Sequence, residues 1–325
     1  MEHDRFFDNT RISGYRGCPR KFYFRHVMHW AGEGWSPPLT FGSSWHAAMD
    51  TVWTASQDDY FSKEDVIKGG YAAFVDCWMD DGAPDPAEMG PEELDRLGAR
   101  TPMNALEMLF DYVDERWDFL KRIDVLEIEK PFAVPLDPND ETLFYVGRLD
   151  KVFEMDGGVY VGEHKTTSLY AVNGGFRSTF LDSFSPNSQV DGYLHALHML
   201  YGEQAKAVWI DAALVHKKHH DIFKFIPIER QIDQLDSWLW DTHQWIEQIE
   251  RDWSADVDSS APFMGAFRKN TDSCQDFARN CPYMMMCKAW PNPIGKPVPE
   301  GFEVNRWSPF ERLELEKIGL EADDE

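Results

Sequence analysis

The feature that most constrains the fold is a hairpin signal in the middle of the chain. Residues 143–155 and 159–165 are two predicted strands, and Asp156-Gly157-Gly158 separates them. An Asp-Gly or Gly-Gly pair between two strands predicts a tight antiparallel turn. The position of that turn decides which charged side chains lie beside one another.

Two positions of the turn are open. If Asp156-Gly157 forms a two-residue turn, Asp150 lies opposite Glu163. If Gly157-Gly158 forms it, Asp150 lies opposite Lys165. Side chains alternate along a strand, so Glu163 and Lys165 share a face. Both registers bring Asp150, Glu163 and Lys165 together, whereas a three-residue loop would separate them.

The group of Asp150, Glu163 and Lys165 combines two carboxylates with an amine. Two carboxylates side by side on a sheet repel each other, and a divalent cation removes that repulsion. Carboxylate oxygens suit Mg²⁺ or Mn²⁺, and a nearby lysine can stabilise developing negative charge or help to orient and deprotonate a water molecule. Together these groups suit hydrolysis of a phosphodiester. Taken alone, Glu163-x-Lys165 is more commonly an exposed strand face with alternating charge.

Other motifs accompany this group in order along the chain. His46 lies on an expected early helix, and Asp150 ends Gly147-Arg148-Leu149-Asp150. Gln189 and Tyr193 are four residues apart, on one face of a helix. With Gly162-Glu163-His164-Lys165-Thr166, this ordered set resembles the PD-(D/E)XK nuclease superfamily. The nearest resemblance is to its RecB-like branch, which includes the AddB nuclease domain, Cas4 and phage iron–sulfur exonucleases, and it extends from about residue 11 to 290.

The resemblance implies roles for individual residues. The ligands of one or two Mg²⁺ or Mn²⁺ ions would be His46, Asp150, Glu163 and the main-chain carbonyl of His164. The catalytic group would comprise Lys165 as the catalytic lysine, Glu163, Asp150, and Gln189 and Tyr193, which would position the scissile strand or the active-site groups. Glu129, on the strand before the hairpin, would be an accessory acid.

The order of elements and the resemblance together predict an α/β fold with a restriction-endonuclease-like core, a central mixed sheet flanked by helices. We expect an N-terminal helical part at 1–122 with Cys18 and His46, a PD-(D/E)XK nuclease core at 123–252, and a C-terminal iron–sulfur module with an acidic tail at 253–325, compact with Cys18. Hydrophobic periodicity predicts helices over residues 11–29, 42–56, 62–79, 101–121, 187–201 and 230–252. Strands are predicted over 124–134, 206–215 and 221–228 besides the hairpin, and a loop or partly ordered insert over 80–98.

Four of the five cysteines are placed unevenly, one near the start and three near the end: Cys18, Cys274, Cys281 and Cys287. Four thiolates suit a [4Fe–4S] cluster or a tetrahedral Zn²⁺ site, and the Cys-x₂-Cys pairs of zinc ribbons are absent from the sequence. The resemblance implies an iron–sulfur cluster that joins the two ends of the chain and helps to grip DNA. The six residues between Cys274 and Cys281 are more than the usual two.

The net charge of −25 argues against a polyanionic partner at long range. The stretch from Arg11 to Gly32 nevertheless carries five basic residues and no acidic one, and residues 216–220 form a second basic spot. Aromatic residues accompany the first stretch, an arrangement that fits either base stacking or a helix core. The weak candidates for DNA contact are Arg16, Arg20, Lys21 and Arg25.

The predicted function is a metal-dependent DNA exonuclease that hydrolyses phosphodiester bonds at DNA ends in recombination, repair or phage DNA processing. Its substrate would be single-stranded DNA or DNA with free ends, with a possible protein partner. The alternative is a non-catalytic iron–sulfur DNA-binding or assembly subunit, and a DNA mimic rests only on the charge. The sequence contains no apolar run long enough to span a membrane and no secretory signal, so we expect a cytoplasmic protein without membrane association.

Overall fold

The computed structural model describes residues 5–276 and 279–306. The chain forms two compact units, each discontinuous in sequence. The central unit comprises Gly34–Lys130 and Arg148–Gln231, and the terminal unit comprises the chain up to Glu33, Pro131–Gly147 and the chain from Ile232. The three domains expected from the sequence are each a continuous segment. In the structure, by contrast, the chain passes from the terminal unit to the central unit between Gly147 and Arg148, inside a single long strand.

The sheet of the central unit is built on the expected hairpin. Strand β4 (Asp140–Met155) pairs antiparallel with β5 (Gly158–Thr167), β5 pairs parallel with β6 (Ala205–Leu214), and β6 pairs antiparallel with β7 (Phe223–Ile228). Asp156 and Gly157 both have positive φ angles, 52° and 79°, and Met155 faces Gly158. The first of the two alternative registers is therefore confirmed, as is an α/β fold with a mixed sheet flanked by helices.

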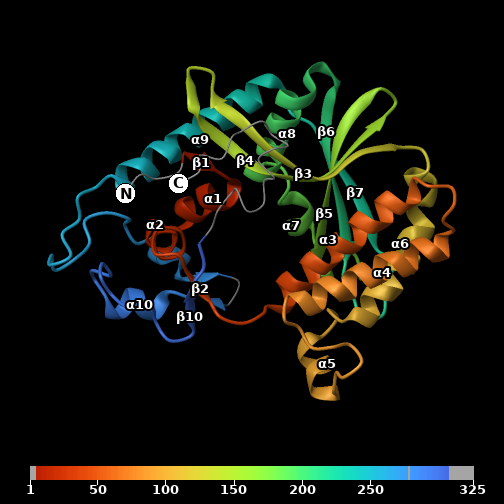
Figure 1. The fold of residues 1–325 in the computed structure, drawn as a ribbon, viewed down its shortest axis with the longest axis horizontal. Coiled ribbons are helices and arrows are strands. Elements are labelled where there is room, and N and C mark those ends of the chain that lie inside the picture. The colour runs from red at the N-terminus through yellow and green to blue at the C-terminus, as the bar shows by residue number, and fades with distance from the viewer. Residues whose placement is uncertain (1–4, 277–278, 307–325) are drawn as a thin grey trace, which may run out of the picture. The chain divides into compact units, whose positions relative to one another are not determined.

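Three long helices cover one face of this sheet (Figure 1). They are α3 (Pro37–Ser56), α4 (Lys63–Asp80) and α6 (Pro102–Leu120). Their shared core is rich in tryptophan, and Trp53 of α3 packs with Phe153 of β4 at a ring distance of 5.6 Å. Helix α8 (Ser188–Tyr201) contacts β5 and β6. The close approach of α3 and α4 requires a glycine, because a Cβ at Gly70 would lie 2.8 Å from Val52.

Two expected boundaries in the central unit are wrong. The helix expected to start at residue 42 begins at Pro37, where a fixed φ and a missing N–H are tolerated in the first turn. The expected loop over 80–98 contains helix α5 (Pro91–Leu97), which starts with Pro91 and two acidic residues and ends at Gly98 with φ 67°. Short helix α7 (Ser178–Asp182) and a 3-10 turn, η2 (Gly202–Gln204), complete the central helices.

The terminal unit combines helices with short strands. Its N-terminal part contains β1 (Phe6–Phe7), α1 (Asn9–Gly17), α2 (Pro19–Phe22), the π-helical turn η1 (Tyr23–Val27) and β2 (Trp30–Gly32). Its C-terminal part contains α9 (Ile232–Trp253), the 3-10 turn η3 (Thr271–Cys274), β8 (Gln275–Asp276), β9 (Arg279–Asn280), α10 (Met284–Ala289) and β10 (Phe302–Val304). Strand β3 (Asp124–Asp137) pairs with β4, β1 pairs with Phe144-Tyr145 of β4, and β10 pairs with β2.

The single helix expected over residues 11–29 is interrupted at Cys18-Pro19. Cys18 is extended, with φ −164° and ψ 109°. A residue that precedes proline is pushed out of the helical region by contact with the proline ring, so the helix restarts at Pro19. The break places Cys18 at a corner between two helices rather than on a helix face.

Candidate active site

Asp150 and Glu163 lie at the point where pairing between β4 and β5 ends. The register runs from Met155↔Gly158 to Lys151↔Gly162, so Asp150 and Glu163 are the next residues on each strand. Both are buried, and the side chain of Glu163 is only 3% exposed. Glu163 Oε2 has no hydrogen-bond partner among the described residues. A buried carboxylate oxygen that lacks a donor is costly, so this position is suited to a cation.

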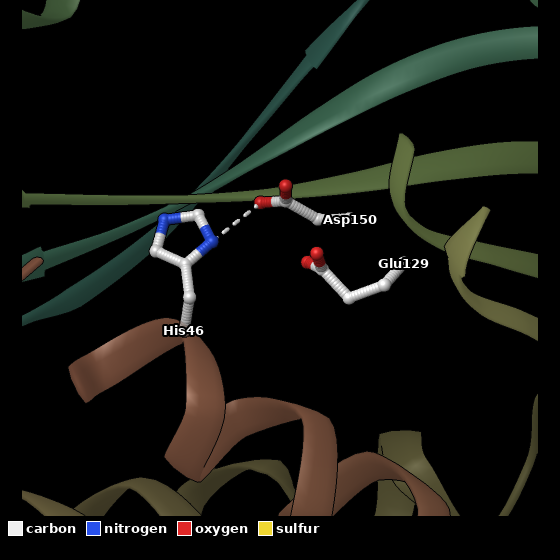
Figure 2. A group of neighbouring side chains, drawn as sticks. All are labelled: His46, Glu129 and Asp150. Carbon is white, nitrogen blue, oxygen red and sulfur yellow. Dashed lines mark ion pairs between the residues drawn. The ribbon is translucent and has the colours of Figure 1, made fainter. Parts of the chain in front are cut away.

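Helix α3 brings His46 to the same point. Its Nδ1 lies 3.0 Å from Oδ2 of Asp150, which also accepts a hydrogen bond of 3.2 Å from the main-chain N–H of His164. Figure 2 shows the His46 ring and the carboxylates of Asp150 and Glu129 pointing into one space. One ligand atom from each of these three residues lies within 4.8 Å of the others. They are the only such group among the described residues.

Glu129 is placed by an unusual backbone conformation. It lies within β3, yet its φ is 50°, a region that residues other than glycine seldom adopt. Its Oε2 forms an ion pair of 2.5 Å with Nε of Arg148, two residues before Asp150. Strained residues concentrate at functional sites, and here the conformation accompanies a carboxylate directed at His46 and Asp150. The expectation of an acid on the strand before the hairpin agrees with this placement.

Lys165 lies on the same strand face as Glu163, and its Nζ forms an ion pair with Glu163 Oε1. Burial alone would lower the pKa of Lys165, but the negative charges of Glu163 and Asp150 raise it. The amine is therefore protonated at neutral pH while it contacts Glu163. Asp150, Glu163 and Lys165 converge as the hairpin argument predicts.

The two central carboxyl groups have opposite pKa shifts. Burial and the charge of Asp150 raise the pKa of Glu163 to about 7. Burial also opposes ionisation of Asp150, but the charge and hydrogen bond of His46 outweigh it and lower the Asp150 pKa. The His46 pKa is raised: burial disfavours its charged form, and Asp150 overcomes that effect. Without a metal ion, protons on His46 and Glu163 thus offset the negative charge of the cluster.

A second ion pair lies directly behind the site. Lys151 is fully buried, and its Nζ contacts Oδ1 of Asp50 on α3. Asp50 is one helical turn after His46, so one face of α3 contacts two consecutive residues of β4. The charge of Lys151 also lowers the pKa of both Asp150 and Glu129, as a minor contribution. We did not expect this pair from the sequence, because nothing local links residues 50 and 151.

The side chain of His164 enters a buried polar network on the opposite face from Glu163. Trp53 Nε1 donates to the Tyr112 hydroxyl at 3.0 Å, and that hydroxyl donates to Asp211 Oδ2 at 2.6 Å. His164 Nδ1 lies 3.5 Å from the same Asp211 oxygen. Burial, followed by the charges of Lys151 and His46, lowers the pKa of His164, so its ring is neutral. No local sequence pattern predicts this network, because its members come from four separate elements, α3, α6, β5 and β6.

Gln189 and Tyr193 form a pair on α8, as their spacing predicts. Gln189 Nε2 donates to the Tyr193 hydroxyl at 2.9 Å. Asn187 caps the helix by accepting from the main-chain N–H groups of Gln189 and Val190, which fixes the first turn. Their predicted role in positioning the scissile strand stays a prediction.

The four cysteines are free thiols in the terminal unit. Among the described residues, they do not form a group of three ligand atoms within 4.8 Å, so a compact cysteine cluster is not supported. They do influence one another: burial raises the pKa of Cys281, and Cys18 and Cys274 add to the shift. The main-chain N–H of Cys281 also donates to the Cys274 carbonyl at 2.9 Å.

The basic stretch near the N-terminus is largely structural, contrary to part of the prediction. Arg20 is 3% exposed, and its guanidinium donates to the carbonyls of Phe267 and Pro291 at 3.0 and 3.4 Å. Arg25 donates to the Asn305 carbonyl, while Arg16 and Lys21 are exposed. The neighbouring aromatic residues are all buried in the terminal unit and cannot stack on bases: Tyr15, Phe22, Tyr23, Phe24 and Trp30.

Comparison with known proteins agrees with this geometry. The profile of the PD-(D/E)XK nuclease superfamily matches residues 9–288, and the chain belongs to that superfamily. The RecB-like branch stays a prediction. No curated protein matches the chain.

Two solved structures are similar at low sequence identity. One is a protein of Eubacterium rectale described as a candidate exonuclease, with 14% identity and a TM-score of 0.42, covering 76% of this chain and 80% of that one. The other is the protein SSO0001, with 11% identity and a TM-score of 0.33, covering 78% of this chain and 83% of that one. Separately, none of the described helices combines the length and apolarity needed to cross a membrane.

Proposed function

We propose that the protein is a metal-dependent deoxyribonuclease whose active site contains His46, Asp150, Glu163 and Lys165. The observation that carries the proposal is the convergence of His46, Glu129 and Asp150 within 4.8 Å, beside the buried Glu163 carboxylate. Membership of a nuclease superfamily gives the reaction class, and the position of Lys165 beside Glu163 supplies the amine that hydrolysis needs.

The donor set fits a hard divalent cation. It offers carboxylate oxygens and one imidazole nitrogen without any sulfur, a combination that suits Mg²⁺ or Mn²⁺. The unpartnered Glu163 oxygen and the left-handed Glu129 backbone both indicate a site shaped for a ligand. His46, Asp150, Glu163 and the main-chain carbonyl of His164 would hold the ion, and Glu129 would be a further ligand.

The other residues of the site would each have a separate role in the reaction. A bound divalent ion would polarise the phosphate and lower the pKa of a water molecule. Lys165, kept protonated by Glu163 and Asp150, would stabilise the negative charge that develops on the phosphate oxygens. Arg148 neutralises Glu129 from the outer side. The Gln189–Tyr193 pair would position the strand or the active-site groups.

We further propose that DNA ends are the substrate, in recombination, repair or phage DNA metabolism, with a protein partner possible. This finer assignment follows from the resemblance to the RecB-like branch. The test incubates end-labelled single- and double-stranded DNA with Mg²⁺ or Mn²⁺ and compares wild type, Lys165→Ala and the control Lys206→Ala, an exposed lysine on β6. Cleavage lost only in Lys165→Ala supports the proposal, and equal cleavage by all three refutes it. A covalently closed circle distinguishes end-dependent from internal cutting.

The cysteines are the subject of a separate proposal, that Cys18, Cys274, Cys281 and Cys287 hold a [4Fe–4S] cluster. Mutual electrostatic influence among these thiols supports it, since Cys18 and Cys281 both raise the pKa of Cys287 after the larger effect of burial. A tetrahedral Zn²⁺ site is the alternative, since four thiolates also suit zinc. Iron and sulfide in anaerobically purified protein would support a cluster, and stoichiometric zinc would refute it. A cluster without nuclease activity would favour the DNA-binding subunit.

A further inference from the structure

Two loops leave the central sheet at one edge, next to Lys165. Strands β5 and β6 are parallel, and their register runs through Lys165↔Ala212 to Thr167↔Leu214. Because parallel strands end on the same side of a sheet, the segments 168–177 and 215–222 emerge together. The main-chain N–H of Val215 donates to the Thr167 carbonyl at 2.7 Å and joins the two segments at their start. Both therefore begin about two strand residues, roughly 7 Å, beyond Lys165.

These two loops carry a series of three adjacent rings, of which two are exposed and His216 is half-buried. Tyr170 contacts His216 edge to face with ring centroids 4.8 Å apart, and His216 stacks on His219 at 4.9 Å. Tyr170 is 49% exposed, and His219 is exposed as well. The orientation of His216 is fixed, because its Nδ1 lies 3.2 Å from the main-chain N–H groups of both Lys218 and His219 and accepts from them. The rings are thus held in place before any ligand arrives.

Positive charge surrounds these rings. Lys217 and Lys218 are exposed between the two histidines; the segment 168–177 contains no acidic residue, and 215–222 contains one, the exposed Asp221. Arg177 is exposed, and its Nε donates to the Tyr170 carbonyl at 3.0 Å, which holds the guanidinium beside the tyrosine. In a chain with a net charge of −25, this local excess of cations is the reverse of the average surface.

We propose that this surface, the aromatic platform of Tyr170, His216 and His219 with Lys217, Lys218 and Arg177, binds the unpaired nucleotides of a DNA strand that enters the active site. Exposed ring faces stack on bases that are not paired, and flanking cations contact the phosphates between them. A blunt duplex offers only its phosphates to the platform, because its bases are already stacked. The inference deepens the proposed nuclease function and rests on it for the identity of the strand.

The experiment measures DNA binding separately from cleavage. Fluorescence anisotropy with a labelled single-stranded oligonucleotide and a blunt duplex is recorded in EDTA, with Lys165→Ala as the background. Removing the rings in Tyr170→Ala/His216→Ala is expected to weaken single-strand binding about tenfold to a hundredfold and to leave duplex binding within about twofold. Removing the charges in Lys217→Ser/Lys218→Ser is expected to weaken the binding of both DNAs. For single strands, the slope of the logarithm of the binding constant against the logarithm of the salt concentration should fall in magnitude by about 1.4.

Matched substitutions elsewhere in the central unit are the controls. Tyr60 is 85% exposed and provides Tyr60→Ala as the aromatic control. Lys63→Ser/Lys68→Ser removes two lysines from α4, of which Lys68 is exposed and Lys63 is half-buried. Tyr170→Phe keeps the ring and should bind single-stranded DNA as tightly as the Lys165→Ala background does. This variant shows whether a substitution at position 170 disturbs the fold of the loop. Two results would overturn the proposed platform. One is that Tyr170→Ala/His216→Ala binds single-stranded DNA as tightly as Tyr60→Ala does; the other is that it loses as much affinity for the duplex as for the single strand. Failure of wild type to cleave DNA would instead refute the nuclease, since binding in EDTA does not depend on it.

Discussion

Nδ1 of His46 lies 3.0 Å from Oδ2 of Asp150, so α3 and β4 meet at the proposed metal site. The contact is an ion pair when His46 is protonated, and its raised pKa favours that state. A divalent ion would have to displace this proton, because imidazole binds metal only in its neutral form. The same pair of residues therefore holds the site together without metal and would supply two ligands with it.

The first prediction concerns His46 itself. His46→Ala removes the only nitrogen of the three-residue ligand group, so we expect Mn²⁺ affinity to fall by at least about tenfold, as for loss of a coordinating contact. Isothermal titration calorimetry measures the affinity, and His198→Ala on α8 is the matched control. Unchanged Mn²⁺ affinity in His46→Ala would show that the histidine is not a ligand.

Glu129 gives a second, sharper prediction, because its neighbour Glu127 is a natural control. Glu129 is directed at His46 and Asp150, whereas Glu127 is exposed and pairs with Lys130. Glu129→Gln should weaken Mn²⁺ binding about tenfold and lower cleavage at limiting Mn²⁺, and Glu127→Gln should do neither. Similar behaviour of the two variants would remove Glu129 from the site.

The third prediction follows from the pKa of Glu163, which burial and then Asp150 raise to about 7. At pH 6 this carboxyl group is mostly protonated, and metal binding needs the carboxylate, so binding releases its proton. Mn²⁺ affinity should therefore fall as pH falls through about 7. Calorimetry at pH 6 in two buffers of different ionisation enthalpy counts the protons released per ion. Glu163→Gln should release about one proton fewer per Mn²⁺ ion than wild type. An equal number of protons released by the two proteins would contradict the raised pKa of Glu163.

The sequence was sufficient for those parts of the site that short-range rules determine. The Asp156-Gly157 turn fixes the register of the hairpin, and a period of two then places Asp150, Glu163 and Lys165 on one face. A spacing of four residues likewise predicts the Gln189–Tyr193 contact. These inferences need only local geometry, and the structure agrees with them.

Sequence reasoning failed where the deciding contact is distant in the chain. The pairs Asp50–Lys151 and His164–Asp211 join residues from separate elements, so no local pattern marks them. The charge of Arg20 predicts a contact with DNA, whereas the carbonyls that accept from its guanidinium belong to residues 267 and 291. The break at Cys18-Pro19 is different, since the rule for residues before proline was available and outweighs the apolar periodicity used to predict a longer helix.

The last prediction concerns the buried pair of Lys151 and Asp50 behind the site. Lys151 is fully buried, so Asp50→Ala leaves an ammonium without its partner in a poorly solvated position. We expect a loss of about 2 to 4 kcal/mol in the free energy of unfolding, less than for a pair buried on both sides because Asp50 is partly exposed. Asp50→Ala/Lys151→Met removes both charges and should recover at least half of that loss, since the cost lies in the unpaired charge and not in the missing attraction. Urea denaturation of the metal-free protein measures all three. A double variant as unstable as Asp50→Ala would mean that α3 and β4 need the ion pair itself to keep His46 beside Asp150.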